Sequence, residues 1–205
     1  MEGRILSLIN EADDFMSARS LNSPRAVGDA LETLISENIE LVVGSDQCKD
    51  CSASFARRAM ADVAFTDADD NYYVVDVKTH RTSTKFNMPN LTSVERLSRF
   101  YDEDANYFSL LMISYDIVGS SVRASSAHFV PIEYLSWDCL TIGALGWGQI
   151  QIANSNNVIV NDGITRKDWM IQLCDTLLEF YPREISKIGD RITRFEAIRE
   201  KWLMR

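Results

Sequence analysis

Three charged residues in the middle of the chain have the types and spacing of a phosphoryl-transfer site. Asp76 and Lys78 interrupt the apolar, β-branched run Tyr72–Thr79, which predicts a strand. Side chains alternate along a strand, so Asp76 and Lys78 project from one face while Val77 points into the core. Asp62 starts the preceding strand, and pairing of the two strands as a hairpin would bring its carboxylate beside Asp76. Two neighbouring carboxylates repel each other, which favours a hard divalent cation such as Mg²⁺ between them.

Lys78 would lie next to that cation. There its ammonium can hold a water molecule against a phosphate and stabilise charge on the phosphoryl oxygens. An acid and a lysine two residues apart also occur as ordinary solvated charges on strands. The upstream Asp62 and the apolar surroundings favour the metal site. Glu32, in an earlier helix, is either an additional acid near the metal or an ordinary surface residue, and the sequence leaves both interpretations open.

The elements that position these residues follow from hydrophobic spacing. Helical spacing runs from Ile5 to Met16, and a second helix begins with Ser23 as its cap and Pro24 at its first position. A strand from Ala61 to Phe65 precedes Tyr72–Thr79, and a polar loop follows at His80–Asn90. After the loop, a capping box of Thr92 and Glu95 predicts the start of a helix. Three strands are then expected, at Tyr107–Ile117, Val122–Pro131 and Trp147–Ala153. Thr165 with Asp168 predicts another helix start, and two helices separated near Pro182 are expected over Trp169–Trp202.

This order of elements predicts an α/β (α+β) fold with helices around one central, mostly antiparallel sheet. The length of 205 residues fits a single domain, residues 1–205. In the last helices, a basic polar face is expected to be exposed, with Ile185, Ile188, Ile192 and Phe195 pointing inward. Three tryptophans, Trp137, Trp147 and Trp169, are expected in the core or an interface.

Charge and composition limit the class of protein. There are 21 Lys and Arg against 30 Asp and Glu, a net charge of −9, which argues against coating nucleic acid or membranes through bulk charge. A nucleic-acid enzyme with a local basic cleft remains compatible with this charge. The longest apolar run, Phe108–Ile113, is far below the roughly 18 residues of a membrane span. Acidic residues soon after Met1 interrupt any signal-peptide core, so a cytoplasmic protein without a membrane partner is expected.

Four cysteines do not make a disulfide framework. Cys48 and Cys51 form an isolated Cys-x-x-Cys pair, whereas a structural zinc needs four ligands. Cys139 and Cys174 are isolated, and neither histidine clusters with the pair. The sequence therefore favours two reduced thiols in a loop over a zinc site.

The spacing Asp62…Asp76-Val77-Lys78 resembles the motif of PD-(D/E)xK nucleases, with Ala61 where the motif name has proline. The wider chain is similar to the EcoRV/HincII-like branch of type II restriction endonucleases. The similarity also rests on the segments Gly28–Glu32, Val75–Thr79, Met88–Leu91 followed by Ser93, Gln149–Ile152 and Asp162–Trp169.

This resemblance implies a restriction-endonuclease-like fold, with a central mixed sheet of five to six strands flanked by helices. It implies a homodimer that cleaves double-stranded DNA with Mg²⁺, with Mn²⁺ able to substitute, leaving blunt 5′-phosphate and 3′-hydroxyl ends. Asp62, Asp76 and the Val77 carbonyl would hold the metal, and Lys78 would be the catalytic lysine.

The resemblance also implies that the loop Thr79–Asn90 and the segment Ala144–Gln149 face the DNA. An Asn amide suits such a position because it can pair with adenine through two hydrogen bonds, and basic residues can contact phosphates, among them Arg57 and Arg58. The DNA-binding candidates are Thr79, His80, Arg81, Lys85, Asn87, Met88, Asn90, Ser93, Trp147, Gln149, Arg166 and Lys167.

Two other functions stay open. One is a homing, repair or phage-encoded nuclease of the same superfamily with a different DNA target. The other is a DNA-binding or protein-interaction module that keeps the fold without cleavage, against which the intact set of Asp62, Asp76 and Lys78 argues.

Overall fold

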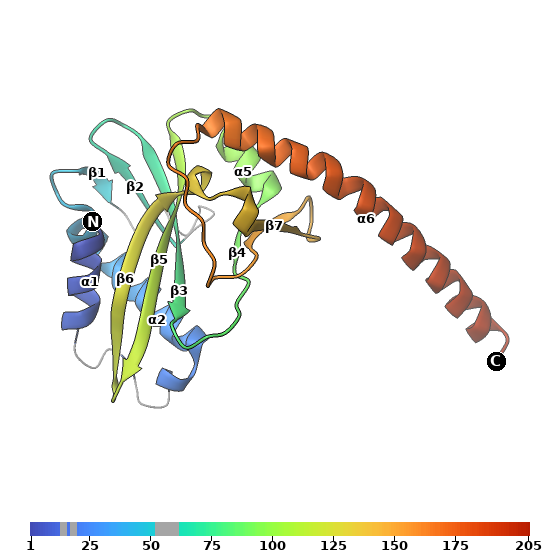
Figure 1. The fold of residues 1–205 in the computed structure, drawn as a ribbon, viewed down its shortest axis with the longest axis horizontal. Coiled ribbons are helices and arrows are strands. Elements are labelled where there is room, and N and C mark those ends of the chain that lie inside the picture. Colours follow the sequence, from blue (N-terminus) through green and yellow to red (C-terminus); the bar gives the residue numbers. More distant parts are fainter. Residues whose placement is uncertain (13–15, 17–19, 52–61) are drawn as a thin grey trace.

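The computed structural model describes residues 1–12, 16, 20–51 and 62–205. In this part of the chain five strands form a central mixed sheet in the order β1-β2-β3-β5-β6 (Figure 1). Only β3 and β5 pair in parallel, and the other neighbours are antiparallel. The fold is therefore mixed α/β with a five-stranded sheet, as the sequence predicts. The strands are β1 Cys48–Cys51, β2 Val63–Asp67, β3 Tyr72–Arg81, β5 Asn106–Val118 and β6 Ser121–Pro131.

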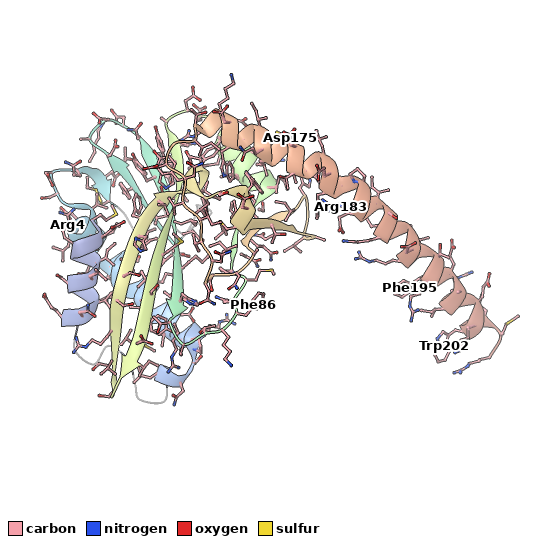
Figure 2. The ribbon with its side chains drawn as sticks, viewed as in Figure 1. Arg4, Phe86, Asp175, Arg183, Phe195 and Trp202 are labelled. Atoms are coloured by element: carbon pink, nitrogen blue, oxygen red, sulfur yellow. A yellow bond between two sulfur atoms is a disulfide. The ribbon has the colours of Figure 1, made fainter. Side chains whose placement is uncertain are left out.

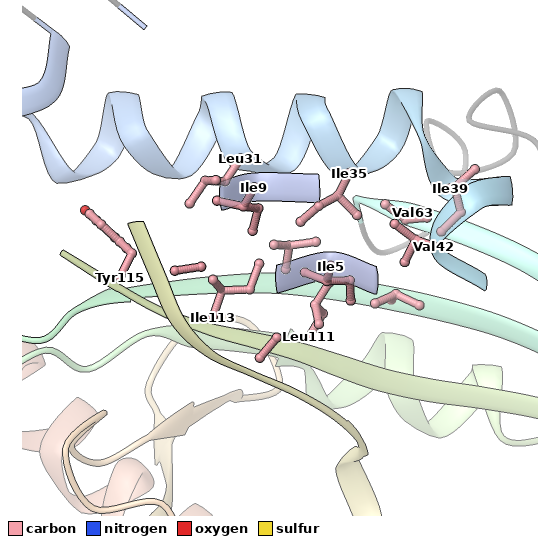
Figure 3. Packing of buried hydrophobic residues seen from close by; sticks show 14 of the residues in the cluster. Ile5, Ile9, Leu31, Ile35, Ile39, Val42, Val63, Leu111, Ile113 and Tyr115 are labelled. Atoms are coloured by element: carbon pink, nitrogen blue, oxygen red, sulfur yellow. The ribbon is translucent and has the colours of Figure 1, made fainter. Parts of the chain in front are cut away.

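Three helices near the N-terminus cover one face of this sheet: α1 Glu2–Glu11, α2 Pro24–Glu37 and α3 Ile39–Val43. They bury a largely aliphatic cluster that includes Val77 of β3. Figure 3 shows Val63 of β2 and Ile113 of β5 in the same cluster. Ser23 caps α2 by accepting a hydrogen bond from the Ala26 amide, and Pro24 takes the first position, as expected.

A second layer covers the opposite face. It contains α5 Val94–Phe100 and a small antiparallel sheet of β4 Asn90–Ser93, β8 Gln149–Ile152 and β7 Leu140–Gly143, in the order β4-β8-β7. Two 3₁₀ turns, Ile132–Tyr134 and Trp137–Cys139, connect β6 to β7, and another, Ser20–Asn22, precedes α2. Trp169, at the start of α6 Arg166–Leu203, is fully buried here, and Trp137 packs against it with ring centroids 5.0 Å apart.

Several local predictions are corrected. The cap of α5 is Ser93, whose Oγ accepts from the Arg96 amide, whereas Thr92 is buried in β4. Cys48 and Cys51 lie in a strand rather than a loop, and they form a disulfide rather than two thiols. The strand β1 pairs with the edge of β2, and this pairing was hidden in the sequence because the four residues Cys48–Cys51 have no apolar alternation.

The C-terminal region is one helix, α6, that continues through Pro182. A proline inside a helix removes one backbone hydrogen bond, at a cost of about 3 kcal/mol, but good helix formers surround this one. The predicted break is therefore wrong. The predicted inward packing is wrong as well, because Ile185, Ile188, Ile192 and Phe195 are all exposed.

No helix among the described residues is both long enough and apolar enough to cross a membrane.

Candidate active site

Asp62 is fixed at the open end of the β2–β3 hairpin, directly before β2 begins. Val63 of β2 pairs with Val75 of β3, and one residue earlier the Asp62 amide donates to the Val75 carbonyl at 3.1 Å. Its carboxylate then accepts a hydrogen bond from the Val77 amide, at 2.7 Å from Oδ2 to N. The Asp62 side chain therefore accepts the hydrogen bond that a backbone carbonyl would accept if β2 were longer. Since the N–H and C=O of one strand residue point to the same side, the Val77 carbonyl faces the same edge as Asp62.

Asp76 and Lys78 project from one face of β3, as the alternation predicts. The Lys78 ammonium lies 2.8 Å from Asp76 Oδ1 and 2.7 Å from Oδ2. The Asp76 residue is only 6% exposed. Its Oδ2 is close to Lys78 but accepts no hydrogen bond with good geometry. One buried carboxylate oxygen can thus still accept a hydrogen bond or bind a cation. Leaving such an oxygen without either lowers the stability of the folded protein.

Glu32 of α2, a helix on the face of the sheet that Val77 points to, lies close to Asp62. Burial raises the pKa of Glu32, and the charges of Asp62 and Asp29 and a hydrogen bond with Asp62 raise it further, whereas Lys78 lowers it. The structure thus brings Glu32 to Asp62, and its participation as an additional acid stays a prediction. We refer to Glu32, Asp62, Asp76 and Lys78 as the acidic cluster.

The electrostatics of the acidic cluster favour an added cation. Burial raises the pKa of Asp76 to about 7; the nearby Lys78 opposes this shift, and the charges of Asp62 and Glu32 increase it. Among the described residues no three His, Cys, Asp or Glu side chains converge as a complete metal centre. The residues nevertheless fit Mg²⁺, which is commonly held by one or two carboxylates with water and substrate phosphate completing its shell. The oxygens that would hold it belong to Asp62, Asp76 and the Val77 carbonyl.

The raised pKa of Asp76 predicts a pH-dependent stability. The folded protein binds this proton more tightly than the unfolded chain, so the stabilisation is complete below about pH 4 and is lost as the pH rises through about 7. Without metal, the free energy of unfolding of the wild type should fall relative to that of Asp76→Asn by up to about 4 kcal/mol between pH 4 and 8. Urea unfolding in EDTA measures this difference. Parallel pH curves for the two proteins would contradict the assigned shift, and Asp69→Asn, in an exposed turn, is the control.

A cavity of about 360 Å³ adjoins the acidic cluster, with Lys78 in its wall. It is lined by residues of β3, β5 and β6, by Asn87 and by residues after β8. Thr79 and His80, two DNA-binding candidates, line it as well. Sequence reasoning missed several polar residues of this wall, namely Ser114, Ser126, His128, Ser155 and Asn156. The alternation of Ser126 and His128 along β6 was a usable signal, but nothing local marks Ser155 or Asn156.

Asn156 holds the loop after β3 in place. Its side-chain amide donates to the carbonyls of Thr84 and Lys85 at 3.1 and 3.0 Å, and its oxygen lies 3.1 Å from His80 Nε2. The Ser155 amide donates to the Asn87 carbonyl at 2.8 Å. The loop leaves Lys85, Met88 and Asn90 exposed, and Figure 2 shows Phe86 on the same loop, at the edge of the molecule. The loop is therefore a supported surface beside the acidic cluster.

Four further DNA-binding candidates are in the small sheet, beside α5 and at the end of β3. Ser93 pairs with Gln149 in the small sheet, and Trp147 is 53% exposed beside α5, with Arg99 over its ring. Arg81 ends β3 and is close to Tyr115. Arg57, Arg58 and Ala61 lie outside the described residues.

Arg166 lies away from the acidic cluster. Its guanidinium is 2.9 Å from the buried carboxylate of Glu133 and lies over the rings of Tyr101 and Tyr107. Tyr107 pairs with Tyr73, five residues before Lys78 on β3 and so about 17 Å from it along the strand. Lys167 is exposed next to Arg166. The structure does not bring this pair to Lys78, and their DNA contact stays a prediction without support from this placement.

This ion pair should stabilise the fold. The side chains of Arg166 and Glu133 are 23% and 5% exposed, so Arg166→Ala leaves a buried carboxylate without its cation. The free energy of unfolding should fall by about 3–5 kcal/mol, whereas Lys167→Ala on the exposed neighbour should change it by less than about 0.5 kcal/mol. Urea unfolding compares the two variants. Equal stability would mean that the pair contributes nothing, and adding Glu133→Gln to Arg166→Ala should recover part of the loss.

No protein-family model matches the chain, and no curated protein shows significant similarity to it.

Proposed function

We propose that this protein is a Mg²⁺-dependent endonuclease that hydrolyses phosphodiester bonds of double-stranded DNA on a restriction-endonuclease-like fold. The observation that carries the proposal is the buried Asp76 carboxylate, with an oxygen that accepts no hydrogen bond, held between Asp62 and Lys78. Both oxygens of Asp76 lie within 2.8 Å of the Lys78 ammonium, but Oδ2 accepts no hydrogen bond. Among the described residues, Lys78 is the one positive charge that acts on Asp76, against the charges of Asp62 and Glu32, and a divalent cation would balance this excess of acids.

Each residue of the acidic cluster has a role in this reaction. Asp62 and Asp76 bind the cation, and the hydrogen bond from the Val77 amide holds the Asp62 carboxylate in position. Mg²⁺ bound there would polarise the scissile phosphate and neutralise its developing charge. Lys78 orients the attacking water and stabilises charge on the phosphoryl oxygens. Water attacks phosphorus in line with the 3′ oxygen, so a new P–O bond forms while the P–O3′ bond breaks, and the leaving 3′ oxygen takes up a proton. This gives the 5′-phosphate and 3′-hydroxyl ends, and the blunt cut, that are expected from the resemblance.

The adjoining surface supports a DNA substrate. Asn87 lines the cavity together with Lys78, and the supported loop after β3 presents Lys85 and Asn90 at the surface. Its amide and basic groups suit base edges and phosphates respectively. A net charge of −9 makes binding depend on this local surface and on the cation. Affinity should therefore decrease steeply with salt.

Cleavage of plasmid DNA of mixed sequence tests the proposal. With Mg²⁺ the protein should yield discrete fragments, and EDTA should abolish them. Sequencing the fragment ends gives the recognition site and the end type. A long asymmetric target would favour a homing nuclease over a restriction enzyme, and a preference for branched or mismatched DNA would favour a repair nuclease. If the protein binds DNA but does not nick it in either Mg²⁺ or Mn²⁺, the proposed catalysis is wrong, and a DNA-binding module without cleavage is the remaining interpretation.

A further inference from the structure

The helix α6 carries an apolar stripe with the spacing of a coiled coil. Its members alternate by three and four residues from Ile171 to Trp202, more than four heptads, and this mean period of 3.5 keeps one stripe facing a partner helix. In heptad notation the a positions are Ile171, Leu178, Ile185, Ile192 and Arg199, and the d positions are Cys174, Tyr181, Ile188, Phe195 and Trp202. Arg199 is the single charged residue in the stripe.

Most of this stripe does not pack on the rest of the protein; the exception is Tyr181, whose hydroxyl donates to the Trp147 carbonyl at 2.7 Å. The residues of α6 that are buried there, Trp169, Leu173 and Leu177, occupy other heptad positions, and all lie in its first third. The second half of α6 extends away from the sheet, with Phe195 and Trp202 on this free part (Figure 2). Ile185 is 69% exposed and Phe195 67% exposed.

We propose that α6 pairs with α6 of a second copy of this chain in a parallel, two-stranded coiled coil. The charges that flank the stripe fit this partner. In a parallel pair a residue at g faces the e residue five positions later on the other helix, so Arg191 of each copy faces Glu196 of the other. The next pair of this kind, Ile198 with Leu203, extends the apolar contact.

An antiparallel pair matches less well. It would place Glu184 opposite Arg191, but Glu184 is already ion-paired with Lys187 of its own helix at 2.6 Å. The same register would bring Asp175 opposite Glu196, two like charges. The parallel pair places Arg199 opposite its own copy, and a single polar residue at an a position is a known means of fixing register at some cost in stability.

The exposed area is large enough for a stable dimer. A standard interface takes about 800 Å² from each partner. The free part of the stripe offers large side chains that are about half exposed or more, on that order of area in total. They are Leu178, Ile185, Ile188, Ile192, Phe195, Trp202 and the flanking Leu203. One helix presents the same surface to its copy, as a two-fold interface requires.

The dimer is inferred from α6 alone. Its parallel orientation would also put both acidic clusters at the same end of the coil, where they could cut the two strands of one duplex; this consequence rests on the proposed function.

Sedimentation equilibrium of the full chain, without DNA or metal, tests the dimer. The wild type should have twice the chain mass of 23.3 kDa at micromolar concentration. The double variant Ile188→Lys, Ile192→Lys should be monomeric, with association weakened by about 100-fold or more, because it places charges in the contact. The control Asp190→Lys, Thr193→Lys adds the same residues on the outer face of the helix and should stay dimeric. Circular dichroism compares the helix content of all three proteins.

A monomeric wild type at 100 µM would overturn the proposal, and so would a double variant that still dimerises. Orientation is measured in a Cys174→Ser background: oxidised Ile192→Cys should form a covalent dimer, because position 192 faces its own copy only in a parallel pair. Asp190→Cys, on the outer face, should not cross-link. If the Ile192→Cys variant dimerises but does not cross-link on oxidation, the parallel arrangement is overturned. A dimer that does not cleave DNA would contradict only the proposed function.

Discussion

Replacing Lys78 with alanine should reduce DNA cleavage by about 10²–10⁴-fold while DNA binding is largely retained. Lys78 is the ammonium beside the proposed cation site, within 2.8 Å of Asp76, and its side chain is still 25% exposed to an incoming phosphate. Its loss removes the group that orients water and stabilises phosphoryl charge. Single-turnover cleavage at saturating protein separates this effect from any change in affinity.

The control is Lys49→Ala. Lys49 is an exposed lysine on β1 that pairs with Asp70 in the hairpin turn, at the opposite end of β2 from Asp62. It should cut as fast as the wild type. Because Lys78→Ala also leaves Asp76 without its cation, thermal unfolding of both variants verifies that they are folded. If folded Lys78→Ala cuts as well as the wild type, the acidic cluster is not the catalytic site.

The placement of Asp62, Asp76 and Lys78 could be predicted from sequence because their geometry is local, whereas that of Glu32, in a separate helix, could not. Alternation along one strand is enough to put Asp76 and Lys78 on the same face, and a short antiparallel hairpin is enough to bring Asp62 next to them. The supporting detail is less local. The strand β2 begins at Val63, one residue after Asp62, so the Asp62 side chain can accept the hydrogen bond from the Val77 amide. The exact residue at which a strand begins or ends is the least reliable part of a prediction from sequence.

Contacts between distant segments could not be predicted in the same way. Arg166 has the sequence character of a phosphate-binding residue, but Glu133, 33 residues earlier, is its partner. Asn156 supports a loop about 70 residues before it. Neither segment has a periodic pattern that specifies its partner, so only the tertiary structure reveals the pairing.

The α6 helix shows a different kind of error. A break at Pro182 follows from the proline alone, whereas the apolar spacing predicts one helix, because Leu178, Tyr181, Ile185 and Ile188 keep one register across the proline. A break there would have allowed the second half to fold back and bury its isoleucines. The uninterrupted helix instead carries them away from the sheet, which turns a predicted core surface into an exposed one.

The Asp62→Asn variant should lose both the cation and the reaction. Asparagine keeps an oxygen that can accept the hydrogen bond from the Val77 amide, so the hairpin should be preserved. It removes one of the two carboxylate charges that favour a divalent cation. We expect affinity for Mn²⁺ to fall by about 10–100-fold, and cleavage at fixed Mg²⁺ to fall by about 100-fold or more. Because the charge of Asp62 raises the pKa of Asp76, the variant should also lower the pKa of Asp76.

Isothermal titration with Mn²⁺ measures the affinity without DNA, and single-turnover cleavage measures the reaction. Asp69→Asn makes the same chemical change in the exposed turn at the far end of the hairpin and should bind Mn²⁺ and cut like the wild type. Restored cleavage at high Mg²⁺ would mean that Asp62 acts through cation affinity alone. If Asp62→Asn binds Mn²⁺ as tightly as Asp69→Asn does, Asp62 is not a ligand, and the unused Asp76 oxygen has to be explained without a cation.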